Sequence, residues 1–154
     1  MLFINDCMLK YKVYTDGGSR GNPGPAACGV IIFDSTGKIV DFTSEYIGDT
    51  TNNVAEYKAL LLAFNLLSVN KISGEVTFYL DSELIVKQLN GEYKVRDTRL
   101  KEYNNKVKVE ITKINSFAIV HVPRKQNKYA DKLVNIALDI NDRSWPVSGF
   151  CKKR

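Results

Sequence analysis

The sequence predicts one α/β domain whose centre is a mixed five-stranded sheet with helices packed against it. Three observations support this prediction. The elements indicated by hydrophobic periodicity follow the order β-β-β-α-β-α-α-β-α. Short turns join the first three strands, which makes them antiparallel, whereas the later strands return through helices and can run parallel. A chain of 154 residues is also long enough to bury one substantial core.

Alternating polarity and turn residues define the three leading strands. Residues 10–15 alternate and run into Asp16-Gly17-Gly18, so the first strand should end there in a glycine-rich loop. Residues 28–33 and 38–47 flank the turn sequence Asp34-Ser35-Thr36-Gly37, which predicts a β-hairpin.

The rest of the chain alternates helices with two more strands. Residues 53–67 are apolar on almost every side, which predicts a helix in the centre of the domain. The elements that follow are a strand at 75–80, a helix from 82 to about 89 that Asn90-Gly91 ends, a charged surface helix at 99–113, a strand at 117–122 and a final helix at 128–138. The domain is therefore assigned to residues 10–140, between a short N-terminal extension (1–9) and a C-terminal tail without clear periodicity (141–154).

Composition argues against several protein classes. No apolar run approaches the roughly 18–20 residues of a membrane span, and the first residues lack the features of a signal peptide. Cys7, Cys28 and Cys151 are too widely spaced for a zinc site or a disulfide framework, although one bridge involving Cys151 stays open. We therefore expect a cytoplasmic protein that does not enter a membrane.

The charge distribution is more informative than the total charge. The formal net charge of +5 favours a polyanionic partner only weakly. Eight cations, however, crowd one stretch of the chain: Lys87, Lys94, Arg96, Arg99, Lys101, Lys106, Lys108 and Lys113. Such a stretch is suited to binding phosphates, while the carboxylates considered next lie elsewhere in the sequence.

Two aspartates follow predicted neighbouring strands. Asp16 comes directly after residues 10–15, and Asp81 comes directly after residues 75–80. Taken alone, Asp16 could start a turn, and Asp81 could cap the helix that begins at Ser82. Together they would bring two carboxylates to the same edge of the sheet. The glycine-rich run after Asp16 lacks the GxxxxGK[ST] spacing of a phosphate-binding loop, so a nucleotide site is not predicted.

Two further acidic residues lie in predicted helices. Glu56 has Ala59, Leu60 and Ala63 as its neighbours one and two turns later, which places it on an inward face. It could form a capping box with Asn53, but a buried carboxylate otherwise needs a cation or hydrogen bonds to stay ionised. Asp131 lies at the start of the last helix, where stabilisation of the helix dipole would be a sufficient role.

The four acids together predict a metal site. Carboxylates at strand ends and helix starts can converge only if their repulsion is offset, and divalent cations do this. Ligands that are all oxygen favour Mg²⁺, with Mn²⁺ as the alternative, over zinc. Two such ions about 4 Å apart would activate a water molecule and stabilise the leaving oxygen of a phosphodiester.

At these residues the chain closely resembles type 1 ribonuclease H, particularly the compact archaeal-like branch of that family. The resemblance covers roughly residues 10 to 140 and is carried, in family order, by Tyr14-Thr15-Asp16-Gly17-Gly18-Ser19-Arg20-Gly21-Asn22-Pro23-Gly24-Pro25, Thr51-Asn52-Asn53-Val54-Ala55-Glu56, Asp81-Ser82-Glu83-Leu84, Gln88-Leu89-Asn90-Gly91-Glu92-Tyr93-Lys94-Val95 and His121-Val122-Pro123-Arg124-Lys125-Gln126-Asn127-Lys128-Tyr129-Ala130-Asp131.

The resemblance implies the ribonuclease H fold and an endoribonuclease that cuts the RNA strand of an RNA–DNA hybrid, leaving 5′-phosphates. It assigns the metal ligands to Asp16, Glu56, Asp81 and Asp131. It also implies that six residues line the minor groove of the hybrid: Gly17, Ser19, Asn22, Asn52, Asn53 and Glu83. Amides, backbone groups and a carboxylate are chemically suited to reading the 2′-hydroxyls that distinguish RNA from DNA.

The sequence departs from the bacterial members of the family in three ways. The short link from Glu92 to Arg99 leaves no room for the basic protrusion that many of them insert. Arg124, seven residues before Asp131, stands in for their mobile catalytic His in the archaeal-type manner, whereas His121 is expected to end a strand. Glu83 stands where relatives often have Gln, so the strength of that substrate contact is open.

Three kinds of alternative remain open from sequence. The first is a catalytically weak module of the same fold that binds the hybrid, and the second is a relative that prefers double-stranded RNA or a domain released from a reverse transcriptase. The third is a purely structural scaffold, which would leave Glu56 unexplained. The first is opposed by the presence of all four carboxylates, because such modules usually lose one. A monomer without an obligate protein partner is expected.

Overall fold

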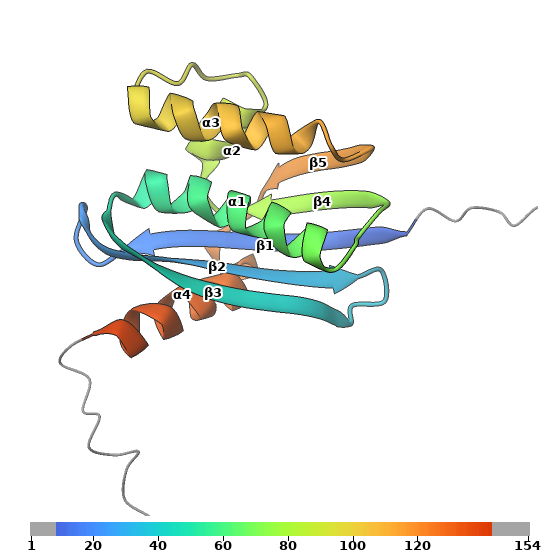
Figure 1. Ribbon diagram of the computed structural model, residues 1–154, viewed down its shortest axis with the longest axis horizontal. Coiled ribbons are helices and arrows are strands. Elements are labelled where there is room, and N and C mark those ends of the chain that lie inside the picture. Colours follow the sequence, from blue (N-terminus) through green and yellow to red (C-terminus); the bar gives the residue numbers. More distant parts are fainter. Residues whose placement is uncertain (1–8, 143–154) are drawn as a thin grey trace, which may run out of the picture.

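The computed structural model describes residues 9–142 and has a five-stranded sheet at its centre (Figure 1). The strands are β1 (Lys10–Ser19), β2 (Gly24–Asp34), β3 (Ile39–Thr50), β4 (Glu75–Leu80) and β5 (Ser116–His121). The helices are α1 (Asn52–Val69), α2 (Glu83–Leu89), α3 (Thr98–Ile111) and α4 (Lys128–Asn141), with a short 3₁₀ turn, η1 (Arg124–Gln126), before α4. The predicted order of elements is confirmed.

The sheet is mixed, as the connections predict. Its strand order is β3-β2-β1-β4-β5. β1 pairs antiparallel with β2 and β2 with β3, whereas β4 lies parallel to both β1 and β5. The two parallel neighbours of β4 are reached through helices, as parallel pairing requires.

Helices cover both faces of the sheet. α1 contacts β1, β2 and α3 on one face, and α4 contacts β1, β2 and β3 on the other (Figure 1). Adjacent residues of β2 show this directly, because Cys28 donates its thiol to the carbonyl of Ala55 in α1 while Gly29 lies against the backbone of Ala130 in α4. The main core fills the space between the sheet and α1, and α1 is buried along most of its length, as its apolar sequence predicts.

One local prediction is wrong, and it concerns the end of β1. β1 does not end at Asp16 but continues, paired with β2, to Ser19. Position 17 requires glycine because the strand passes close to α1, and an added Cβ would lie 2.2 Å from the carbonyl of Ala55. The alternative in which Glu56 forms a capping box with Asn53 is excluded, because Thr51 caps α1 and its side chain accepts from the amide of Val54.

Some of the predictions concern the two ends of the chain. The extension and tail assigned to residues 1–9 and 141–154, with Cys7 and Cys151, lie almost wholly outside the described residues. Cys28 is a buried free thiol. Within residues 9–142, no helix combines the length and apolar character that crossing a membrane requires.

Candidate active site

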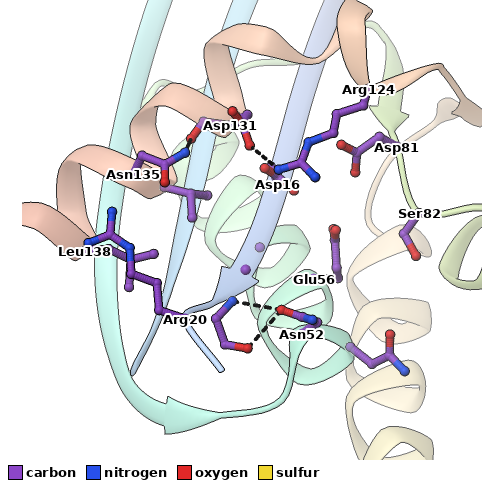
Figure 2. A pocket seen from close by; sticks show the side chains of 15 residues that line it. Asp16, Arg20, Asn52, Glu56, Asp81, Ser82, Arg124, Asp131, Asn135 and Leu138 are labelled. Carbon is purple, nitrogen blue, oxygen red and sulfur yellow. Dashed lines mark hydrogen bonds and ion pairs between the residues drawn. The ribbon is translucent and has the colours of Figure 1, made fainter. Parts of the chain in front are cut away.

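The open hollow of about 460 Å³ at one edge of the sheet contains all four acidic residues singled out from the sequence (Figure 2). It forms where β1 outruns β4: their parallel pairing stops at Tyr14 and Tyr79, while β1 continues past Asp16. The hollow is lined by Asp16, Gly17, Gly18, Ser19, Arg20, Asn52, Asn53, Glu56, Asp81, Ser82, Arg124, Asp131, Val134, Asn135 and Leu138.

Three carboxylates converge from three different elements. Asp16 comes from β1, Glu56 from the second turn of α1, and Asp81 from the residue that follows β4. One carboxylate oxygen from each lies within 4.8 Å of the other two. Asp81 does not cap α2, because the Ser82 side chain accepts from the amide of Ile85 in that role.

Burial and mutual repulsion make these groups poor anions in the absence of a cation. Desolvation, with the nearby Asp81 charge second, raises the pKa of Asp16 to about 7. Desolvation followed by the Asp16 charge raises the pKa of Glu56 well above its ordinary value. Burial also raises the pKa of Asp81, although the Arg124 guanidinium opposes this shift.

The donor set fits a divalent cation. One oxygen of Glu56, Oε2, is buried without a hydrogen-bond partner. An ionised carboxylate in that position is costly unless a cation approaches it. Oxygen ligands from Asp16, Glu56 and Asp81 are those that hard cations such as Mg²⁺ prefer. The structure therefore provides a set of ligands for a divalent ion.

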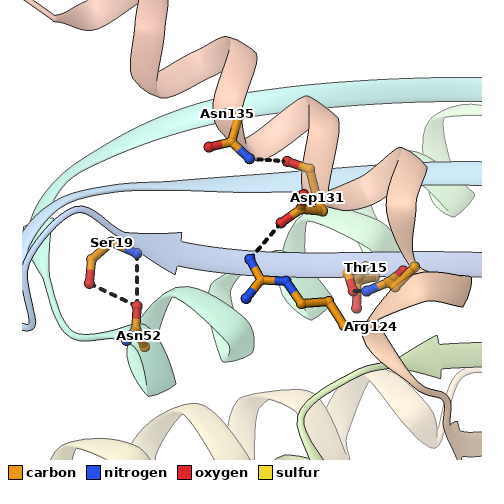
Figure 3. Close-up of polar contacts among 7 residues, drawn as sticks. Thr15, Ser19, Asn52, Arg124, Asp131 and Asn135 are labelled. Carbon is orange, nitrogen blue, oxygen red and sulfur yellow. Dashed lines mark hydrogen bonds and ion pairs between the residues drawn. The ribbon is translucent and has the colours of Figure 1, made fainter.

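Asp131 lies in the same hollow but outside the group of three. It is in the first turn of α4 and forms an ion pair with Arg124, whose Nη2 lies 3.0 Å from Oδ1 of Asp131 (Figure 3). The backbone carbonyl of Asp131 accepts a hydrogen bond from Asn135, one turn later in α4. The charge of Asp131 still raises the pKa values of Asp16 and Asp81, so the four acids form one electrostatic unit.

A polar network beside the acids joins β1 to the start of α1. Ser19 donates to Oδ1 of Asn52 from both its amide and its hydroxyl, each at 2.9 Å (Figure 3). The amide of Asn52 in turn donates to Oδ1 of Asn22 at 3.1 Å. These bonds fix the orientation of the Asn52 side chain at the rim of the hollow.

The other residues predicted to contact substrate are less closely grouped. Gly17 and Asn53 line the hollow, whereas Asn22 and Glu83 do not. Glu83 is exposed at the start of α2, where its carboxylate lies 2.8 Å from the Lys87 ammonium group. His121 ends β5, as predicted, and is not among the residues that line the hollow.

Sequence reasoning missed several residues at the site. Arg20 lines the hollow and forms an ion pair with Asp139 of α4. Asn127 is almost completely buried next to the acids. Asn127 carried one usable signal, since an amide just before a helix is a common cap, but here its side chain makes no capping bond. The Arg20 ion pair spans most of the chain, and only the fold brings its partners together.

Comparisons with known proteins agree with this geometry. A family model described as reverse transcriptase-like matches residues 14–137. The crystal structure of RNase H1 from the archaeon Halobacterium salinarum superposes with a TM-score of 0.82 at 38% identity, covering 85% of this chain and 98% of that one. LC11-RNase H1, in complex with an RNA/DNA hybrid, gives 0.81 at 46% identity, covering 84% and 97%. The chain belongs to the type 1 ribonuclease H family.

The chain spans only part of the length of the first curated relatives that it matches. Ribonuclease HI of Halobacterium salinarum is 40% identical over 130 residues, which are 84% of this chain and 65% of that protein. A bifunctional protein of Mycobacterium tuberculosis is 34% identical over 132 residues, which are 85% of this chain and 36% of that protein. The fold and the family predicted from the sequence are confirmed. The absence of a basic protrusion is confirmed too, because α3 begins at Thr98, shortly after α2 ends at Leu89.

Proposed function

We propose that this ribonuclease H homologue is an endoribonuclease that hydrolyses the RNA strand of RNA–DNA hybrids and leaves 5′-phosphates. One observation carries the proposal: Asp16, Glu56 and Asp81 offer oxygens within 4.8 Å of one another in an open, polar hollow. The substrate class is supported by the 46% identity with LC11-RNase H1, a protein whose structure contains an RNA/DNA hybrid.

The carboxylates would hold two divalent ions, Mg²⁺ by preference and Mn²⁺ as the alternative. When bound, such ions polarise a phosphodiester and lower the pKa of water. The protein supplies the ligands Asp16, Glu56, Asp81 and Asp131. Asp131 can offer Oδ2 while Arg124 keeps its ion pair with Oδ1. The other donors of the Arg124 guanidinium would be free to contact phosphate oxygens, whose geometry matches its fork of donors.

The polar network would select RNA. Hydrogen bonds to Ser19 and Asn22 hold Asn52 at the rim of the hollow and leave its Nδ2 available to a substrate. Binding through Nδ2 would therefore cost little further conformational entropy. We assign 2′-hydroxyl recognition to Ser19, Asn22, Asn52 and Asn53, together with the backbone at Gly17. Glu83 would make a weaker contact, because Lys87 already pairs with it.

A labelled RNA–DNA hybrid, duplex RNA and duplex DNA, each incubated with Mg²⁺, Mn²⁺ or EDTA, test the proposal. We expect cleavage of the RNA strand of the hybrid alone, and none in EDTA. Binding of the hybrid without cleavage would favour a catalytically weak module, and equal cleavage of duplex RNA would favour a double-stranded-RNA enzyme.

Asp16→Asn and Asp81→Asn provide the matched variants. Each keeps the shape of the side chain and removes the charge that a cation needs, so both should abolish cleavage while the circular dichroism spectrum stays that of the wild type. Lys71→Gln, an exposed change after the far end of α1, is the control and should cleave normally. Substantial Mg²⁺-dependent cutting by either purified Asn variant would refute the four-carboxylate assignment.

A further inference from the structure

Asn127 is a buried polar residue placed between the short turn η1 and helix α4. Only 1% of its surface is exposed, which makes it one of the most completely buried side chains among residues 9–142. Burying an amide costs free energy unless hydrogen bonds replace its contacts with water. The groups to which such a residue hydrogen-bonds therefore indicate its role in the structure.

The side chain of Asn127 connects two strands at the hollow. Its Nδ2 donates to the carbonyl of Thr15 at 2.8 Å, the bond that reaches Thr15 in Figure 3. The same amide lies close enough to the Asp81 carboxylate to oppose the rise in its pKa. An ionised carboxylate can only accept, so the amide can act on both oxygens only through the two hydrogens of its NH₂ group. Oδ1 of Asn127 has no partner, which leaves donation as the only interaction that orients the amide.

The backbone of Asn127 extends this connection to α4 and to the arginine. Its carbonyl accepts from the amide of Asp131 at 3.1 Å, and its amide donates to the carbonyl of Arg124 at 3.0 Å. Thr15 immediately precedes Asp16 in β1. One residue thus hydrogen-bonds to the strand that carries Asp16 and to the backbone of both Arg124 and Asp131, and its amide lies near the carboxylate of Asp81.

We infer that Asn127 is a positioning residue that sets the spacing of the carboxylates on β1, β4 and α4. It does not itself line the hollow, so it acts through Asp16, Asp81 and Asp131 and not on the substrate. The inference deepens the proposed function and rests on it. Its consequence is specific: loss of the amide should weaken divalent-ion binding and turnover, while affinity for the hybrid stays nearly unchanged.

Asn127→Ala tests the inference against a matched control, Asn70→Ala. Asn70 is also an amide whose Nδ2 donates to two acceptors, Oδ2 of Asp41 at 2.7 Å and the carbonyl of Leu66 at 2.9 Å, and it lies after the far end of α1, outside the hollow. Both variants should melt at lower temperature in EDTA. Only Asn127→Ala should raise the Mn²⁺ dissociation constant measured by calorimetry, and lower the single-turnover rate, each by roughly tenfold or more. The hybrid dissociation constant should change less than about twofold.

Equal metal affinity and equal turnover in the two variants would overturn the inference, because Asn127 would then be an ordinary core amide. Asn127→Ser keeps one donor but cannot reach two acceptors, so it provides the same test if the alanine variant does not fold. Calorimetry needs no cleavage and separates the two proposals. If the wild type binds Mn²⁺ but does not cut the hybrid, the proposed function fails, while the effect of Asn127 on metal affinity is still measured.

Discussion

Asp16 and Glu56 lie where a negative charge is least stable without a cation. The pKa of Asp16 is raised to about 7, compared with about 3.9 in an unfolded chain. Between these values the unfolded state releases its proton first, so the folded state binds more protons and stability falls as the pH rises. This loss of folding stability is absent below about pH 4 and complete above about pH 7.

This titration predicts a pH-dependent melting temperature in EDTA. The wild type should melt at clearly lower temperature at pH 8 than at pH 5, and Asp16→Asn should show a smaller fall and the higher melting temperature at pH 8. Added Mg²⁺ at pH 8 should raise the melting temperature of the wild type more than that of the variant. Identical pH profiles of the two proteins would contradict the close packing of the acids.

Arg124 and His121 make different predictions about the last chemical steps. Arg124 lines the hollow and pairs with Asp131, whereas His121 ends β5 outside it. We expect Arg124→Ala to lower turnover by roughly ten- to a hundredfold, the effect of losing one electrostatic contact. His121→Ala should cost less. Single-turnover cleavage by both variants from pH 6 to 9 is the measurement, and a slower His121→Ala enzyme would reverse the assignment.

At the level of elements, the position of α4 depends on a glycine in the strand beneath it. An added Cβ on Gly29 would lie 2.4 Å from the carbonyl of Ala130 and 2.9 Å from Cβ of Leu133. The helix backbone cannot yield as a flexible side chain would. Because α4 carries Asp131, which lines the hollow and pairs with Arg124, any displacement of this helix also moves part of the hollow.

Gly29→Ala should therefore destabilise the protein by about 1–3 kcal/mol, the usual effect of overpacking. Gly18→Ala is the control, because its Cβ would face the same helix at an ordinary 3.6 Å from Val134. Urea unfolding of the two variants gives the comparison. Equal midpoints would mean that α4 can shift away from β2 without loss.

The sequence predicted the helices and strands well but not the contacts between them. Within residues 9–142, periodicity located each α-helix and strand, and it gave the bounds of β4 to the residue, because burial on one face imposes a regular pattern. The short turn η1 was not predicted. Periodicity placed Asp16 at a strand end and read Gly17 as a loop residue, because a glycine required for close approach to α1 looks like a turn glycine. The roles of Asn127 and Arg20 depend on long-range contacts, which leave no local pattern.

At the scale of the whole molecule, a run of positive charge lies apart from the acidic site. The carboxylates gather at the edge of the sheet, whereas α2, α3 and the link between them carry seven of the eight cations of residues 87–113, and Lys113 follows α3. Lys94, Lys101 and Lys108 line a common hollow beside Asn104 and Asn105. Because the link between α2 and α3 holds no basic protrusion, we expect these lysines to contact the phosphates of a bound hybrid.

Phosphate contacts release counterions, so binding should weaken steeply with salt, by about 0.9 in log–log slope for each contact. With the inactive Asp81→Asn protein as background, Lys94→Glu and Lys101→Glu should each flatten that slope by about one. Lys71→Glu makes the same change of charge after the far end of α1 and should shift affinity slightly without changing the slope. The measurement is the hybrid dissociation constant between low and moderate KCl. If all three variants show the same slope as the background protein, the hybrid lies on another face, and the lysines of α3 contribute only to the net charge.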